Sequence, residues 1–193
     1  MVKVAFIVEG DVEKIIVEEC FIQTGWLESK NIEPLTPVIN AGGGGNLCPR
    51  NMPIYVEQAK ALNPDKIIIL TDLECDPCIE KTKERLGDCD NCITIISRKS
   101  FEAWFLADDT LLSKMTNGNY THYNNPELTT HMPYDAFKAL MVQYAGRGTG
   151  SKVRTANKVA ENNFNIENAG RHPNCPSAKY FIDKVDELGN LGV

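Results

Sequence analysis

The sequence predicts an α/β fold, with a parallel four-stranded sheet flanked by helices and a C-terminal helical extension. Short apolar runs alternate with amphipathic segments of helical period in the order βαβαβαβα, which is typical of a parallel sheet. The chain has 193 residues, 42% hydrophobic and 24% charged, which is the composition of a single globular domain. Because such crossovers are right-handed, the carboxyl ends of the strands are expected to share one edge of the sheet.

Each element has its own signal. Residues 3–8 form an uninterrupted apolar run suited to a buried strand, and Asp11 is expected to cap the helix that follows. Further strands are predicted over 37–40, 66–71 and Cys92–Ser97, and helices over 53–62, Ile79–Leu86 and 101–112. The four glycines at 42–45 are interpreted as a flexible turn, with a phosphate cradle as the weaker alternative.

The second part of the chain is expected to be helical. Residues 116–133 are polar and predict an irregular insertion or lid, followed by helices near 134–144, 153–161 and 177–188. The predicted organisation is an α/β core over residues 1–113, with the insertion and helical extension over 114–193 packed on it as one domain.

Charge and hydropathy exclude some functional classes. The net charge of −6 divides into −7 over residues 1–96 and +1 over 97–193, which argues against a general nucleic-acid coat and fits a local carboxylate cluster. The longest apolar runs, 4–8 and 67–70, are far below the roughly 18 residues of a bilayer span, so no membrane association is expected. The N-terminal run is also too short for a signal peptide, which predicts a cytoplasmic protein.

Acidic residues follow two of the predicted strands. Glu9 comes directly after the first, and Asp72, Glu74 and Asp76 come after the strand over 66–71. Both exits are expected at one sheet edge, where carboxylate oxygens would suit Mg²⁺ or Mn²⁺. The alternative is that Asp11 and Asp72 merely cap helices, but capping explains neither Glu9 nor Glu74.

These residues resemble a known family. An apolar strand followed by Glu9, Gly10 and Asp11, with the segment 71–76 after another strand, is similar to the Toprim domain of topoisomerases, primases and OLD-type nucleases. The resemblance implies that Glu9 is the general acid or base and that Asp72, Glu74 and Asp76 are metal ligands. Glu74 stands where the family pattern has aspartate.

A second resemblance covers more of the chain. The segment 100–108, which contains a Glu-Ala-Trp sequence, and the segment 175–181 resemble the small stand-alone OLD/RloB-like Toprim proteins. The resemblance implies a Toprim-like fold and, as in some relatives, a phage-defence role beside an ABC-type ATPase. Glu102 would add a further catalytic carboxylate at the same edge, or is simply a first-turn glutamate favoured by the helix dipole. Trp104 and Phe105 are expected in the core.

The cysteines suggest a second metal. Cys75 and Cys78 form one CxxC pair, and Cys89 and Cys92 form another, with ten residues between the pairs. Two such pairs are compatible with structural Zn²⁺. A reducible disulfide pair or unrelated thiols are the alternatives. A fully helical Ile79–Leu86 segment would rise about 12 Å, which separates the two pairs too far for one ion unless the chain doubles back.

Four basic residues lie close together in the segment 147–158, whereas the histidines do not cluster along the chain. Arg147, Lys152 and Arg154 lie among small residues that would let a phosphate approach, although a solvated helix face explains them equally well. The three histidines, at positions 122, 131 and 172, show no ligand spacing and receive no role.

The function predicted from these features is Mg²⁺- or Mn²⁺-dependent, nuclease-like phosphodiester processing on DNA or RNA. The alternative is a non-catalytic subunit that docks on an ABC-type ATPase. A dinucleotide-binding protein is disfavoured because Glu9 stands where a phosphate would need glycine and G-x-G-x-x-G is missing.

Overall fold

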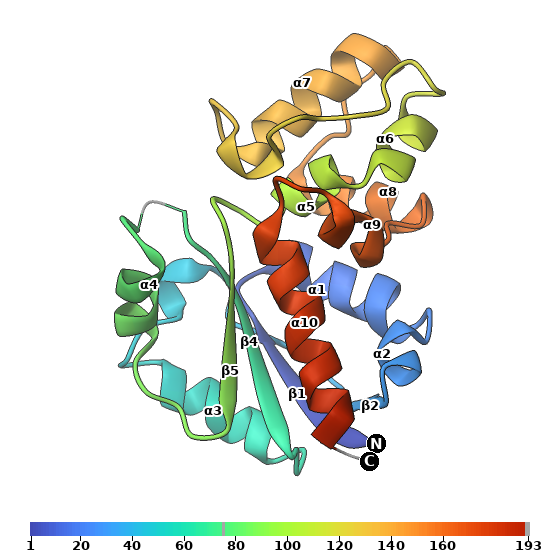
Figure 1. Cartoon of the computed structure of the whole chain (residues 1–193). Helices are drawn as coiled ribbons and strands as arrows, with labels where there is room; N and C mark the ends of the chain where they lie inside the picture. The colour runs from blue at the N-terminus through green and yellow to red at the C-terminus, as the bar shows by residue number, and fades with distance from the viewer. Residues whose placement is uncertain (75, 192–193) are drawn as a thin grey trace.

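The computed structural model describes residues 1–74 and 76–191 and has the predicted α/β architecture (Figure 1). Its strands pair in parallel in the order β2-β1-β4-β5, with β3 also on β1. The strands are β1 (Val2–Val8), β2 (Ile32–Pro34), β3 (Ile39–Asn40), β4 (Lys66–Asp72) and β5 (Cys92–Ser97). The fold class expected from the sequence is therefore confirmed.

The sheet has one strand more than the four expected. Both β2 and β3 pair with the same side of β1, β2 opposite residues 2–4 and β3 opposite residues 7–8. The sheet edge is thus one interrupted strand rather than two neighbouring ones. The sequence did not indicate β2 because it has only three residues and ends in a proline, which removes the strand pattern.

Helices cover both faces of the sheet and the carboxyl ends of its strands (Figure 1). α3 and α4 lie on one face, α1, α2 and α10 lie on the other, and α5 to α9 form a layer beyond the strand ends. The α-helices are α1 (Asp11–Ile16), α2 (Trp26–Ser29), α3 (Met52–Lys60), α4 (Ile79–Leu86), α5 (Ala103–Ala107), α6 (Asp109–Met115), α7 (Pro133–Ala145), α8 (Lys152–Glu161), α9 (Ile166–Arg171) and α10 (Pro176–Leu191). The π-helix η1 (Val17–Ile22) continues α1, and the short 3₁₀ turns are η2 (Gly44–Asn46) and η3 (Pro126–Leu128).

The period of two in β1 and β4 divides the core between the two faces. In β1, Val4, Phe6 and Val8 pack toward α1 and α10, whereas Ala5 and Ile7 pack toward α3. Trp104 is fully buried beside Phe181 of α10, with ring centroids 5.5 Å apart. Phe105 is also fully buried, so the expectation that both aromatic residues belong to the core is confirmed.

The helix expected over 101–112 is two helices, α5 and α6, that meet at Asp108. Its side chain accepts hydrogen bonds from the backbone N–H groups of Thr110 (3.0 Å) and Leu111 (3.1 Å), which caps α6. It also accepts one from the Asn165 backbone N–H (2.9 Å), so the break ties α6 to the start of α9. Aspartate favours such an N-cap over a helix interior, and the apolar period alone did not show this.

The polar segment over 116–133 is largely irregular, as expected, and contains only the short turn η3. The sequence did not indicate the short helices α2 and α9. Among the described residues, no helix combines the length and the hydrophobicity that crossing a bilayer requires.

The contact of α10 with the chain entering β2 leaves no room for a side chain at Gly189. A Cβ there would lie 2.0 Å from the backbone oxygen of Lys30. Although alanine is the better helix former, we expect Gly189→Ala to lower the free energy of unfolding by at least about 1 kcal/mol, since backbone must move. Chemical denaturation tests this. Gly148→Ala, whose Cβ would lie 3.7 Å from Val142, is the control and should change stability by less than about 0.5 kcal/mol.

Candidate functional site

The carboxylate of Glu9 is fixed at the carboxyl end of β1. Its backbone N–H donates to the Leu70 carbonyl (3.1 Å), which continues the pairing of β1 with β4. Its Oε2 accepts hydrogen bonds from the Thr71 hydroxyl (2.6 Å) and the Asp72 backbone N–H (3.0 Å). The side chain is buried. One carboxylate oxygen is held by residues of β4, and the other faces the glycine turn.

Asp72 is held by the next strand and the turn that follows it. Its Oδ1 accepts hydrogen bonds from the Ser97 hydroxyl at the end of β5 and from the Phe101 backbone N–H (2.8 Å). The carboxylate is buried. Two adjacent strand ends therefore orient it, as the parallel topology predicts.

Glu74 completes a group of three. Its backbone has φ +42°, and its N–H donates to the Lys99 carbonyl (2.9 Å). One carboxylate oxygen each of Glu9, Asp72 and Glu74 can be chosen so that all lie within 4.8 Å of one another. Of the four acidic residues that the sequence places at the two strand exits, the structure thus brings three together and leaves Asp76 out.

Asp76 lies in a different set of interactions. Its Oδ2 accepts from the Arg85 Nε (2.9 Å) and from the Thr82 hydroxyl (2.9 Å) at α4, and the Arg85 guanidinium holds the pKa of Asp76 below its ordinary value. Asp76 is therefore an ion-pair partner of Arg85 rather than a member of the three-carboxylate group.

Arg85 organises the loops around the site, although the sequence did not single it out. Its Nη1 donates to the carbonyls of Gly44 (3.0 Å) and Leu47 (3.2 Å), and Nη2 lies 3.5 Å from the carbonyl of Asp72. These hydrogen bonds hold the glycine turn close to Glu9. A Cβ at Gly44 would lie 2.7 Å from Oε1 of Glu9. A side chain at position 44 would collide with the carboxylate of Glu9, which explains why glycine suits this position.

Two further buried carboxylates adjoin the group. Glu13 of α1 accepts a hydrogen bond from the Gly10 backbone N–H (3.0 Å). Glu102 accepts from the Ser100 hydroxyl (2.6 Å) and pairs with Lys152 of α8 (3.2 Å). The sequence indicated Glu102 but missed Glu13. The available signal for Glu13 was its place three residues after Gly10, where glutamate often binds the N-cap backbone.

The accumulation of negative charge alters proton affinities. Burial first, then the charges of Glu13 and Glu9, raises the pKa of Asp72 well above its ordinary value, against an opposing hydrogen bond from Ser97. Burial, helped by Glu9 and Glu102, raises the pKa of Glu13 from 4.5 to about 7. Burial lowers the pKa of Lys152, but Glu102 and Asp72 outweigh it, so the net shift is upward. The site favours a proton or another positive charge.

The basic residues indicated as phosphate ligands divide into two kinds. Lys152, the first residue of α8, reaches the carboxylates through Glu102. Arg147 and Arg154 have exposed side chains. All three side chains are exposed, and Lys152, with half of its side chain exposed, is the one of the three that pairs with a carboxylate of the site.

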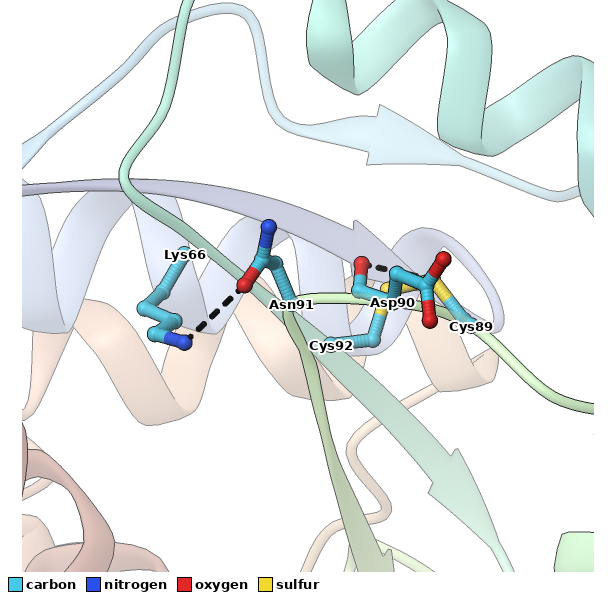
Figure 2. Close-up of a disulfide and its surroundings, with 5 residues drawn as sticks. All are labelled: Lys66, Cys89, Asp90, Asn91 and Cys92. Atoms are coloured by element: carbon cyan, nitrogen blue, oxygen red, sulfur yellow. Dashed lines mark hydrogen bonds between the residues drawn. A yellow bond between two sulfur atoms is a disulfide. The ribbon is translucent and has the colours of Figure 1, made fainter.

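The described cysteines of the two CxxC pairs are not gathered at one point. Cys89 and Cys92 form a disulfide (Figure 2), in the turn where Asn91 accepts a hydrogen bond from Lys66 (3.2 Å). Cys92 is paired in register with Ile67, whereas Asp72 is opposite Ser97, so the disulfide lies at the far end of the sheet from the carboxylates.

Cys78 is exposed at the start of α4, which is helical over all of Ile79–Leu86. The helix that separates Cys78 from Cys89 and Cys92, anticipated from the sequence, is therefore present. Cys75 lies outside the described residues. Zinc binding by Cys75, Cys78, Cys89 and Cys92 stays a prediction for the reduced protein.

Comparison with protein-family models and with curated protein sequences finds no match. Among solved structures, the chain is similar to the C-terminal region of the Burkholderia pseudomallei OLD protein, with 15% identity, a TM-score of 0.44, and coverage of 96% of this chain and 99% of that chain. The C-terminal region of the Xanthomonas campestris pv. campestris OLD protein gives 15% identity, a TM-score of 0.43, and coverage of 98% and 96%. OLD-type proteins are also among those that the sequence motifs resemble.

The raised pKa of Glu13 predicts a pH-dependent stability. Between pH 4.5 and about 7 the folded protein retains a proton that the unfolded chain releases, so stability falls as pH rises through this window. We expect Glu13→Gln to flatten this part of the stability profile, measured by urea denaturation at pH 5, 6, 7 and 8 without divalent cations. Glu33→Gln, an exposed residue of β2, should retain the wild-type slope. Equal slopes in wild type and Glu13→Gln would contradict the prediction.

Proposed function

We propose that this chain is a Mg²⁺- or Mn²⁺-dependent enzyme that processes phosphodiester bonds of DNA or RNA, in the manner of a nuclease. The single observation that carries the proposal is the convergence of Glu9, Asp72 and Glu74 at the carboxyl ends of β1 and β4. Their donors are all carboxylate oxygens, the ligands that these hard cations prefer. Burial and the charges of Glu13 and Glu9 raise the pKa of Asp72, so this member of the group favours a proton or another positive charge.

The donor set fits such a cation, and Glu9, Asp72 and Glu74 are the residues that would hold it. The ion would polarise the scissile phosphate and stabilise the charge that develops on its oxygens. Asp76, which the sequence resemblance includes among the ligands, is engaged by Arg85 and would stabilise the loop instead.

The remaining side chains have separate tasks in this proposal. Glu9 has one oxygen fixed by Thr71 and Asp72, which orients the other to take a proton from the attacking water or to return one to the leaving oxygen. Glu102 positions Lys152, whose ammonium group would contact the substrate phosphate. Arg147 and Arg154 would extend this contact along the nucleic-acid backbone.

The phage-defence role and the ABC-type ATPase partner belong to the proposal in the same way, as implications of the sequence resemblance. A non-catalytic subunit of such an ATPase is the alternative function. Absence of metal-dependent cleavage of single- and double-stranded DNA and RNA, with and without an ATPase partner, would favour that alternative.

We expect purified protein to cleave nucleic acid with Mg²⁺ or Mn²⁺ and not with excess chelator. Glu9→Gln should lower the cleavage rate by about 100-fold or more, because the substituted amide cannot transfer the proton. Gel assays of labelled DNA and RNA measure this, and Glu33→Gln should cleave at the wild-type rate. Cleavage that is unchanged in Glu9→Gln would overturn the role assigned to this residue.

The basic residues should affect binding rather than chemistry. We expect Arg154→Ala to weaken substrate binding and to reduce the slope of log affinity against log salt by about one unit, since one phosphate contact is lost. Fluorescence anisotropy at several salt concentrations, in Ca²⁺ to prevent turnover, measures both quantities. Lys179→Ala on α10, whose partner is Asp183, is the matched control. An unchanged slope in Arg154→Ala would remove this residue from the interface.

The glycine turn offers a sharper test of the metal site. The Cβ of Gly44→Ala would displace Oε1 of Glu9, whereas a Cβ at Gly45 meets no atom of the described structure within 4 Å. We therefore expect Gly44→Ala to weaken Mn²⁺ binding by at least about tenfold and Gly45→Ala to leave it unchanged. Electron paramagnetic resonance of free Mn²⁺ measures the affinity. Equal affinities in the two variants would argue against Glu9 as a ligand.

A further inference from the structure

A second group of metal-ligand side chains lies in the helical layer, on residues to which the sequence gave no role. Asp109 is the first residue of α6, His122 belongs to the irregular segment after α6, and His172 follows α9. One ligand atom from each can be chosen so that all three lie within 4.8 Å of one another. We propose that Asp109, His122 and His172 form a binding site for Zn²⁺ or a similar transition-metal ion.

The contacts within the group already resemble those of a ligand set. His122 Nδ1 lies 3.0 and 3.1 Å from the two carboxylate oxygens of Asp109, so a ring nitrogen and a carboxylate already face each other. The imidazole rings of His122 and His172 are stacked with their centroids 5.1 Å apart. Three segments that are distant in the sequence thus direct nitrogen and oxygen donors to one point.

His172 supplies an independent observation. Its side chain is 7% exposed, and within the part of the chain that the structure describes its Nε2 is buried without a hydrogen-bond partner. Leaving a buried polar nitrogen without a partner is unfavourable, and coordination would give it one. Burial, with a contribution from His122, lowers the pKa of His172, which is the direction that favours the neutral imidazole a metal ion needs.

The donor chemistry selects the class of metal. Two imidazoles and one carboxylate suit Zn²⁺ and its neighbours, in contrast to the all-oxygen group at Glu9, Asp72 and Glu74. Asp109 and His122 are about half exposed, with side-chain exposures of 52% and 47%, which leaves the fourth position open to water or an external ligand. The site is therefore of the open, three-ligand kind.

One interaction opposes binding and limits the affinity. His172 Nδ1 accepts a hydrogen bond from the Asn174 backbone N–H (3.1 Å), which places the proton of the neutral ring on Nε2. Coordination through Nε2 moves that proton and displaces the turn over 172–174. An ion bound here would connect α6, the polar segment and the end of α9, and so stabilise the layer that carries Lys152.

The experiment is a Zn²⁺ titration of the full chain after chelator treatment, with excess Mg²⁺ present to occupy the carboxylate group. Long-range ¹H–¹⁵N spectra report the histidine ring nitrogens separately from any thiol ligands. We expect one equivalent of Zn²⁺ to shift the ring resonances of His122 and His172 and to leave those of His131 in place. Calorimetry should show that His122→Gln weakens binding by at least about tenfold.

His131→Gln is the matched control, because it makes the same substitution at an exposed histidine outside the group. His122 is itself exposed, so its replacement should not prevent folding, which circular dichroism checks. Unshifted resonances of His122 and His172, or equal Zn²⁺ affinities in the two variants, would overturn the proposal.

Discussion

The structure depends on an electrostatic constraint at the carboxyl edge of the sheet. Glu9, Glu13, Asp72 and Glu102 are all buried there, each with less than a tenth of its surface exposed. Burying ionised carboxylates near one another is unfavourable unless protons, hydrogen-bond donors or cations compensate. The raised pKa values of Asp72 and Glu13 show that the protein's own groups compensate only in part. This deficit of positive charge is the physical basis of the cation site that we propose.

The hydrogen-bond donors and the positive charge that the protein itself provides to the buried carboxylates come from several parts of the fold. Backbone N–H groups at strand ends donate to Glu9 and Asp72, and hydroxyl groups of Thr71, Ser97 and Ser100 add further donors. Lys152 arrives from α8, far along the chain, and α8 packs against α1, which carries Glu13. The helical layer is thus part of the site, because it supplies both a cation and the cover that keeps the carboxylates from water.

The two ligand groups differ in a way that follows from their surroundings. The carboxylates lie at the end of a parallel sheet, where the topology brings strand exits together and supplies backbone donors. The Asp109, His122 and His172 group lies where a polar segment crosses two short helices, without sheet support. The first group offers only carboxylate oxygens and has two buried members, whereas the second includes nitrogen donors and has two exposed members. For the two sites that we propose, this difference predicts a preference for Mg²⁺ or Mn²⁺ at the first and for Zn²⁺ at the second.

The sequence by itself determined the α/β class, the strands that carry Glu9 and Asp72, and the burial of Trp104 and Phe105, because apolar periodicity and strand exits are local properties. It could not determine which acids meet, because that depends on pairing between distant segments. Asp76 pairs with Arg85 and so does not join the other acids, whereas Glu13 of α1 lies beside them. His122 and His172 lie close together although they are 50 positions apart and show no spacing signal. The edge strand β2 and the break at Asp108 were decided in the same way, by tertiary hydrogen bonds that outweigh a short or ambiguous local pattern.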